Sequence, residues 1–411
     1  MRKILVLEDS KDIAEICKEI FFDFDVTIAE TIGEALKNIN QDYDLMILDV
    51  RLPDGSGLGD FLLVLRNAGI NTPVIVYSSI LEEDDRRHVE ESNDLGAVCF
   101  IAKPARLTTL RNAALAALGE SGEELKIAEG DSFAFIQDAP DGTHKLVTLS
   151  GSSPVEFAVI RDSRKERTFC LPSQYGCREG CNFCVTGTML NKHVRKLTCK
   201  ELQSKLGLSL LYGGKFKGRT RIFFAGEGEF SRNIPNILKF MQDQKNEYEY
   251  RASTVGLIET LPLIIESFAK IPEFNQLQIS LHAPNDFVRK QLMRSAFRNS
   301  ISEILRLGEE FAQKSGKKVA LNYVLFEGKN DSPKMIRELV ELLKGRDCFF
   351  LRLSKANAYD EYLSVSDRET HLIAEEISYE GIEVKNFKSA GQGTSSPCGC
   401  AGALIAGGGR C

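Results

Sequence analysis

Long apolar runs are missing from this sequence of 411 residues. No stretch approaches the roughly 20 apolar residues of a membrane helix, so we expect no membrane insertion. The N-terminus does not have the pattern of a signal peptide, because Glu8 and Asp9 directly follow its short apolar run. Tryptophan is also absent, which excludes no class of protein. These features predict a cytoplasmic protein.

Cysteine is plentiful by comparison, with 11 residues. In a sequence without secretion signals, this number indicates metal or redox chemistry rather than structural disulfides. The net charge of −6 is unevenly divided, because residues 1–120 carry −10 and residues 132–411 carry +7. Any nucleic acid should therefore bind the back part. Length predicts two or three domains, and we place a first domain at 1–120, a polar, glycine-bearing linker at 121–131, a small β element at 132–165 and a second large domain at 166–411.

Three cysteines with the spacing CxxxCxxC lie on one short stretch, at Cys177, Cys181 and Cys184. Three thiolates can bind three irons of a [4Fe-4S] cluster and leave the fourth iron open to a small molecule. A structural zinc site is the alternative, but zinc usually takes four protein ligands in paired motifs. No nearby Cys or His pair completes such a set, whereas ferredoxin motifs supply a fourth cysteine. The spacing favours an open, reactive cluster.

The first 120 residues alternate short apolar runs with amphipathic stretches, which predicts a doubly wound parallel sheet. The expected strands are 4–7, 26–29, 45–48, 74–77 and 98–101. Ligands bind at the carboxyl ends of such strands, where Glu8, Asp9, Asp49, Ser78 and Lys103 are found. Three carboxylates suit Mg²⁺, and a hydroxyl with a lysine suits a phosphoryl group.

This pattern resembles the receiver domain of response regulators, through the motifs LEDS, ILDVRLPDGSG, YSS and FIAKP. The resemblance implies a flavodoxin-like fold, phosphorylation of Asp49 by a sensor histidine kinase, and Mg²⁺ on Glu8 and Asp9. Ser78 and Lys103 would contact the phosphoryl group, and Phe100 would be the switch aromatic. A degenerate receiver that only dimerises is the alternative.

Strand-like and helical stretches alternate again from Thr168 onward, which predicts a partial parallel barrel of about six β/α units. The expected strands are 221–225, 252–255, 277–281, 319–325, 349–353 and 383–387. Several motifs with polar residues lie at the ends of these strands or directly after them: Gly226-Glu-Gly-Glu229, Ser253, Ser280-Leu281-His282 and Asn357. Their shared position at one face predicts that they form a site.

This back part resembles radical SAM enzymes, specifically the RlmN/Cfr family of RNA adenosine methyltransferases, from about Asp141 to Gly402. The carrying motifs are DGTHK, CLPSQYGC, GEGE, STVG, ISLHAPND, YVLFEGKND and the C-terminal CG. The resemblance implies that S-adenosylmethionine chelates the open iron. It also implies the residues that hold this cofactor, which are Gly228, Glu229, Ser253, Ser280, Leu281, His282 and Asn357.

The resemblance further implies a radical methylation through protein cysteines. One cofactor molecule would methylate Cys398, and a second, cleaved by an electron from a donor such as flavodoxin, would activate that methyl group. The methyl carbon would then add to an adenine carbon, carbon 2 or carbon 8, of rRNA or tRNA. Cys170 would release the product through a disulfide, and Glu156 would match the family's acid. Two buried structural thiols are the alternative for Cys170 and Cys398.

The sequence also departs from this family. A receiver stands where the family usually has a small helical RNA-binding domain, and Phe230 and Ala358 replace two of its prolines. A radical SAM enzyme with another substrate and a redox-sensing scaffold therefore remain alternatives. No helix-turn-helix follows the receiver, so we expect no DNA-binding output. The sequence contains two basic runs: Lys192, His193, Arg195 and Lys196, and then Lys215, Lys217, Arg219 and Arg221. Each run either faces RNA or belongs to a solvated surface.

Overall fold

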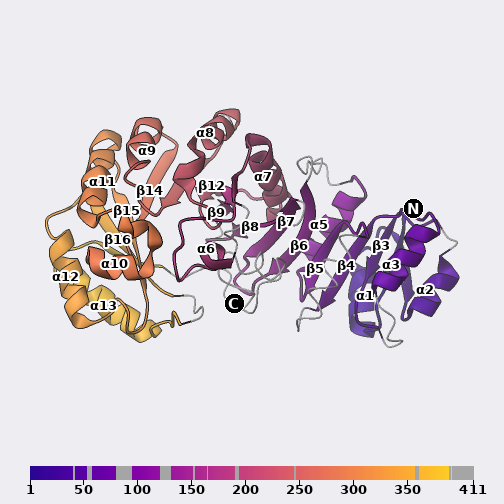
Figure 1. Ribbon diagram of the computed structural model, residues 1–411. Coiled ribbons are helices and arrows are strands. Elements are labelled where there is room, and N and C mark those ends of the chain that lie inside the picture. Colours follow the sequence, from indigo (N-terminus) through magenta and orange to yellow (C-terminus); the bar gives the residue numbers. More distant parts are fainter. Residues whose placement is uncertain are drawn as a thin grey trace. The chain divides into compact units, whose positions relative to one another are not determined.

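The computed structural model describes residues 1–39, 42–52, 58–79, 95–120, 131–150, 153–163, 165–189, 194–244, 247–356, 361–387 and 390 (Figure 1). The chain forms two compact units. The first comprises Met1–Pro154 and Ser204–Phe216, and the second comprises Val155–Gln203 and Lys217–Cys411. Within the described residues, no helix is long and apolar enough to cross a membrane.

The first unit begins with a parallel sheet of five strands in the order β2-β1-β3-β4-β5. The strands are β1 (Lys3–Leu7), β2 (Asp25–Ala29), β3 (Leu45–Leu48), β4 (Val74–Ser79) and β5 (Cys99–Lys103). Every residue of β3 is buried, as expected for a central strand covered on both faces. The helices described in this part are α1 (Lys11–Ile20), α2 (Ile32–Asn38), α3 (Leu58–Asn67) and α5 (Leu107–Ala117). The predicted doubly wound receiver fold is confirmed.

The sheet of the first unit continues beyond β5. Strand β6 (Asp131–Asp138) pairs in parallel with β5, and β7 (His144–Ser150) pairs antiparallel with β6. The Asp138 carboxylate accepts hydrogen bonds from the backbone N–H of Arg106 and the hydroxyl of Thr109, at the start of α5. The C-terminal part of α7 (Cys199–Gly213) also belongs to this unit, where Lys205 forms a fully buried ion pair with Asp131. Strands from the 132–165 region thus extend the receiver sheet.

The second unit contains the partial parallel barrel. Strand β8 (Ser153–Ile160) pairs antiparallel with β9 (Glu166–Leu171), which begins a parallel series in the order β9-β12-β13-β14-β15-β16-β17. The remaining strands of the series are β12 (Arg219–Phe224), β13 (Glu249–Thr254), β14 (Phe274–Ser280), β15 (Val319–Leu325), β16 (Phe349–Lys355) and β17 (Val384–Asn386). All six strands expected after the cysteine loop are present, and the predicted partial barrel is confirmed.

Helices pack on the outer side of these strands (Figure 1). They are α8 (Ile234–Asp243), α9 (Leu261–Phe268), α11 (Ile301–Ser315), α12 (Pro333–Leu343) and α13 (Asp367–Tyr379). Local sequence explains where they begin, because Ser300, Ser332 and Ser366 each accept a hydrogen bond from a first-turn N–H. Strand β13 alternates half-buried and buried residues, so Arg251 and Ser253 face the barrel interior and their neighbours face the helices.

Short elements lie at the carboxyl ends of the barrel strands. They are β10 (Gln174–Tyr175), α6 (Val185–Met189), β11 (Arg195–Lys196), η1 (Phe230–Asn233), α10 (Asp286–Leu292) and η2 (Arg294–Phe297). The cysteine loop separates β10 from α6, and α10 follows β14. This end of the barrel therefore carries the predicted chemistry.

Candidate active site and phosphoacceptor site

The predicted phosphoacceptor site is assembled at the carboxyl ends of β1, β3, β4 and β5. Asp49 accepts a hydrogen bond of 2.5 Å from the Ser78 hydroxyl and pairs with the Lys103 ammonium at 2.5 Å. Lys103 also contacts Glu8 at 2.6 Å. The structure thus brings together these four side chains, and Asp9 lies beside them with an exposed carboxylate.

The electrostatics of this site suit a cation and a phosphoryl group. Burial raises the pKa of Glu8 more than the Lys103 ammonium lowers it. Burial alone would lower the pKa of Lys103, but attraction to Asp49 and Glu8 outweighs this and raises it. The ligand oxygens of Glu8, Asp9 and Asp49 all lie within 4.8 Å of one another. These oxygen donors fit Mg²⁺, which prefers carboxylates, and the binding of Mg²⁺ stays a prediction.

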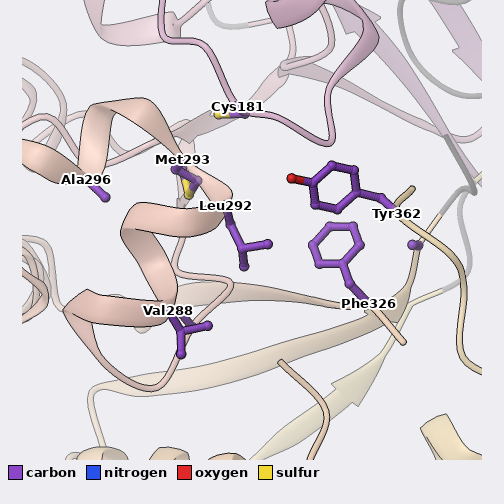
Figure 2. Close-up of a cluster of buried hydrophobic side chains, with 9 residues drawn as sticks. Cys181, Val288, Leu292, Met293, Ala296, Phe326 and Tyr362 are labelled. Carbon is purple, nitrogen blue, oxygen red and sulfur yellow. The ribbon is translucent and has the colours of Figure 1, made fainter. Parts of the chain in front are cut away.

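The cysteine loop is held in place by the segment that follows β14. The backbone N–H of Asn182 donates to the carbonyl of Leu292 at 2.9 Å, and that of Arg294 donates to Gly180 at 3.2 Å. Cys181 forms an isolated β-bridge with Met293, and Figure 2 shows the two side by side. Nearby, the ring of Phe183 contacts His282, Phe326 and Tyr362. The loop is therefore anchored on an apolar core rather than free in solvent.

The three loop thiols fit a cluster better than a single metal ion. Three thiolates bound to one zinc at about 2.3 Å would lie within about 4 Å of one another. Among the described residues, the only group of three ligand atoms within 4.8 Å is the acidic trio of the receiver, so the three thiols of the loop are farther apart. Burial also raises the pKa of all three thiols. Because burial disfavours the ionised form, a bound metal centre is what would hold them as thiolates.

Glu229, which follows β12 and caps η1, is a buried carboxylate with several protein partners. It accepts hydrogen bonds from the hydroxyl and N–H of Ser231, the hydroxyl of Thr254 and the N–H of Val255. Burial raises its pKa despite these bonds. At Gly228, with φ of +89°, a Cβ atom would lie 2.6 Å from the Cβ of Gln174. Glu229 and Gly228 therefore hold the segment after β12 close to η1, to the end of β13 and to Gln174. Contact of these two residues with S-adenosylmethionine stays a prediction.

The predicted cofactor residues of β13 and β14 converge around Asn322 of β15, which the sequence analysis did not identify. The Asn322 amide donates to the Ser253 hydroxyl at 3.4 Å, and its carbonyl accepts from the N–H groups of Leu281 and His282. The His282 ring accepts from the N–H of Val324 at 3.1 Å through Nδ1. Burial, followed by the nearby Arg289 cation, lowers the pKa of His282 to about 3, so the ring is neutral.

Arg289 is the second residue that the sequence analysis missed. Its side chain is fully buried, and its guanidinium donates to the backbone carbonyls of Val255, Ser280, Leu281 and Asn299. One cation thereby joins the ends of β13 and β14 to the segment before α11. Burial lowers its pKa to about 10, so it stays charged at neutral pH, and the nearby thiol of Cys181 favours that charge. Nothing in the sequence indicated this role. A charged residue four positions before an apolar one, as Arg289 is before Met293, is a common pattern that does not indicate burial.

Cys170 and Glu156 lie on the neighbouring strands β9 and β8. Cys170 pairs with Ala158, two residues from Glu156, so their side chains lie on one face. The Cys170 thiol is buried and lies 3.5 Å from the carbonyl of Ala225. The Glu227 carboxylate accepts from the N–H of Glu156 at 2.9 Å and from that of Gly176 at 2.7 Å. Glu227 thus ties the strand of Glu156 to the start of the cysteine loop.

Two predicted site residues, Asn357 and Cys398, lie outside the described residues. The same holds for Cys400 and Cys411. Cys17, Cys99 and Cys199 are buried, as expected of packing thiols. Cys348 is only half-buried, because it precedes β16 at the open end of that strand.

Comparison with known proteins gives the family. The receiver-domain profile of response regulators matches residues 4–115, and the radical SAM superfamily profile matches residues 171–343. Over 268 residues, the chain is 31% identical to a protein of Thermotoga neapolitana named probable dual-specificity RNA methyltransferase RlmN. That match covers 63% of this chain and 75% of the relative. The chain belongs to the RlmN family of radical SAM methyltransferases.

Further comparisons agree with this family. A protein of the same name from Clostridium perfringens is 29% identical over 301 residues, which cover 71% of this chain and 84% of the relative. A solved radical SAM methyltransferase from Sphaerobacter thermophilus aligns with a TM-score of 0.59 and 23% identity. It covers 83% of this chain and 96% of its own, and it supports the fold.

The basic runs of this RlmN family member are partly neutralised. Arg195 pairs with Glu201 and stacks on the ring of Tyr175. Arg219 pairs with Glu249, and Arg221 is buried between Glu166 and Glu249. The exposed lysines among the described residues of these runs are Lys196, Lys215 and Lys217, while Lys192 and His193 lie outside the described residues. A role of these lysines toward RNA stays a prediction.

Proposed function

We propose that this chain is a phosphorylation-regulated radical SAM methyltransferase that methylates an adenine carbon, carbon 2 or carbon 8, of rRNA or tRNA through a methylated Cys398. The observation that carries the proposal is the link between the start of the cysteine loop and the strand of Glu156, through the buried carboxylate of Glu227. The names of the RlmN relatives support RNA as the substrate.

The residues fit the [4Fe-4S] cluster and S-adenosylmethionine that this family implies. Cys177, Cys181 and Cys184 would hold the cluster, which with the cofactor supplies one-electron radical chemistry. Gly228, Glu229, Ser253, Ser280, Leu281, His282 and Asn357 would surround the cofactor. Burial of the loop on its apolar core keeps water from the reacting groups.

Cys170 and Glu156 would act on the substrate itself. After the adduct has given up its unpaired electron to the cluster, Cys170, as a thiolate, would attack the sulfur of Cys398. A disulfide forms as the bond between that sulfur and the methylene carbon breaks, and the released base takes up a proton on this carbon to complete its methyl group. Glu156 would take the proton from the ring carbon, because a buried carboxylate next to the reacting atom can serve as a general base. Both side chains face the same side of their strands, which this division of labour requires.

Replacing Cys170 with alanine tests this function. Without the resolving thiol, the covalent adduct between Cys398 and RNA should persist, so the purified variant should carry cross-linked RNA and turn over at background rate. Digestion and mass spectrometry of the adduct would identify the modified nucleotide and its carbon.

Cys348→Ala is the matched control, because Cys348 is half-buried beside β16 and should leave turnover unchanged. A Cys170→Ala protein that is free of RNA, together with a Cys398 that is never methylated in cells, would contradict the RNA methyltransferase proposal. An adduct with a molecule other than RNA would instead support a receiver-controlled enzyme with another substrate.

The contacts within the first unit support regulation by the receiver. Phe100, the expected switch aromatic, is buried and stacks on Phe135 of β6, with ring centroids 6.2 Å apart. Lys103, which contacts the phosphoacceptor, ends the same strand as Phe100. A change at Asp49 that moves β5 would therefore be felt directly by β6 and by Asp138, which binds the start of α5.

Asp49→Asn tests the regulation. The wild type should incorporate phosphate from acetyl phosphate with Mg²⁺, and the variant should not, because the amide is no nucleophile. We expect phosphorylation to raise methylation by at least about fivefold, the lower end of ordinary coupling energies, by relieving inhibition from the acidic receiver. Asp42→Asn, an exposed acid before β3, should behave as the wild type. Equal turnover with and without the phosphodonor would make the receiver a tether only.

The partners and location follow from these proposals. A sensor histidine kinase would phosphorylate Asp49, and an electron donor such as flavodoxin would reduce the cluster. We also place the protein in the cytoplasm, because the thiols of the cysteine loop need a reducing compartment to act as cluster ligands.

A further inference from the structure

The surface beside the cysteine loop is formed by two segments that bind each other. The loop residue Asn182 bonds to this neighbouring segment twice, with its N–H to Leu292 and its amide to the carbonyl of Gln291 at 2.9 Å. The backbone of Gly180 passes close to the side chain of Arg294, because a Cβ atom there would lie 3.1 Å from the Arg294 Cδ. Figure 2 shows Cys181 on this loop, directly beside α10 and Met293. This surface therefore lies next to a cluster ligand.

Positive charge dominates the same surface. Residues 177–183 and 286–298 contain five cations and two anions. Four of the cations are exposed, and among the described residues no carboxylate pairs with them; they are Arg178, Lys290, Arg294 and Arg298. The two anions are engaged elsewhere, since Glu179 pairs with Arg232 at 2.9 Å and Asp286 accepts from the N–H of Ile301. We name the four cations together with Phe297 the cluster-loop patch.

The patch has the composition of a docking surface. Phe297, in η2, is 69% exposed, although a large aromatic side chain gains from burial. Aromatic and arginine side chains are enriched at protein interfaces, and complementary charge accelerates encounter with a partner of opposite sign. An apolar ring among four unpaired cations therefore fits a partner whose surface combines acidic groups with an apolar centre.

We propose that the cluster-loop patch is the docking surface for a small acidic electron-transfer protein. The proposal rests on the proposed function, because only a cluster at the loop needs an electron. In each transfer the bound donor is oxidised by one electron, and the cluster held by the three cysteines is reduced by one. Electron transfer weakens steeply with distance, so a donor is best placed over the loop that carries the ligands. Redox partners typically bind each other through small, weak interfaces, and a patch of four cations and one aromatic ring is consistent with such an interface.

RNA is the competing acidic occupant, and topology disfavours it. The target base has to reach Cys170 on β9, whereas all members of the patch except Arg178 belong to segments that follow β14. Strands β12 and β13 separate these two in the sheet. Lys290, Arg294, Phe297 and Arg298 are thus beside the loop of Cys181 but separated in strand order from Cys170.

The test compares two reductants on charge-reversal variants. Lys290→Glu and Arg298→Glu reverse two exposed patch charges for which the described part of the chain offers no ion-pair partner, and Arg337→Glu reverses an exposed cation on α12 as the control. Formation of 5′-deoxyadenosine is measured with enzymatically reduced flavodoxin and, separately, with dithionite. With flavodoxin at low salt we expect a loss of about tenfold for the double patch variant, since steering by charge is worth about 10- to 1,000-fold in on-rate. With dithionite, all variants should equal the wild type.

Binding of flavodoxin, measured by titration without turnover, is the second readout, and it should weaken in the patch variant and not in Arg337→Glu. Unchanged binding and unchanged flavodoxin-driven rates in the patch variant would overturn the proposal. So would an equal loss with both reductants, which would mean that the patch only supports the loop. Normal flavodoxin rates with weaker retention of RNA would assign the patch to nucleic acid. If the wild type formed no 5′-deoxyadenosine with dithionite, that result would count against the proposed function. The binding titration would still show whether the patch binds flavodoxin.

Discussion

Replacing Cys181 with alanine is expected to abolish the iron–sulfur absorbance of the anaerobically purified protein and to reduce 5′-deoxyadenosine formation to background. Cys181 is buried, and it is the ligand that the β-bridge to Met293 fixes against the core. Two remaining thiols cannot hold three irons. Because the cluster supplies the electron for cofactor cleavage, loss of one ligand removes the reaction rather than slowing it. Iron content, visible absorbance and cofactor cleavage would be measured on the same sample.

Cys199→Ala is the matched control for this experiment. Cys199 is also a buried thiol, but it begins α7, where its Sγ lies 3.3 Å from the carboxylate of Asp243 at the end of α8. It should retain the iron content of the wild type. A Cys181→Ala protein with a full complement of iron and normal absorbance would refute the assignment of the loop. Zinc instead of iron in the wild type would do the same.

Replacing Arg289 with methionine is expected to destabilise the second unit by at least about 3 kcal/mol, because several buried carbonyls lose their donors and each unsatisfied group costs about 1–3 kcal/mol. The guanidinium satisfies the carbonyls of Val255, Ser280, Leu281 and Asn299 at once. Methionine fills a similar volume but donates nothing. The denaturation midpoint of the full chain would be followed by circular dichroism, and hydrogen exchange would locate the loss at the ends of β13 and β14.

Two variants separate this role from a general effect of substitution. Lys290→Met changes the next residue of the same helix, which is exposed, and it should shift stability by no more than about 0.5 kcal/mol. Arg289→Lys keeps the charge with three donors on one nitrogen, so we expect an intermediate loss. If Arg289→Met unfolded at the same midpoint as Lys290→Met, the strand ends would not depend on the guanidinium.

The strands of both units could be predicted from the sequence because their signals are local. Strand β15 has the predicted bounds, Val319–Leu325, since an apolar run between a polar turn and a glycine fixes both ends. The receiver site was also predictable, because each of its residues immediately follows or ends a strand. Parallel strands place those ends at one edge, so Asp49, Ser78 and Lys103 meet without further information.

Side-chain roles within the radical SAM motifs were less accessible. The sequence motif GEGE presents Glu227 and Glu229 alike, yet the structure gives them different partners. Glu227 binds backbone N–H groups of β8 and of the cysteine loop, whereas Glu229 binds β13 and η1. Apart from Ser231 of η1, the partners are contributed by segments tens of residues away, and a short motif contains no information about them.

The sequence by itself determined the fold classes, and it predicted the ligand types and the chemistry: five acid, hydroxyl and lysine groups for phosphoryl transfer, and three thiols for an open cluster. Only the tertiary structure decided that β6 extends the receiver sheet, that Lys205 is fully buried against Asp131, and that Arg289 holds two strand ends together. The reason is physical. From the sequence alone, a charged side chain is predicted to be exposed to solvent. Whether it is buried depends on partners that only long-range packing brings within reach.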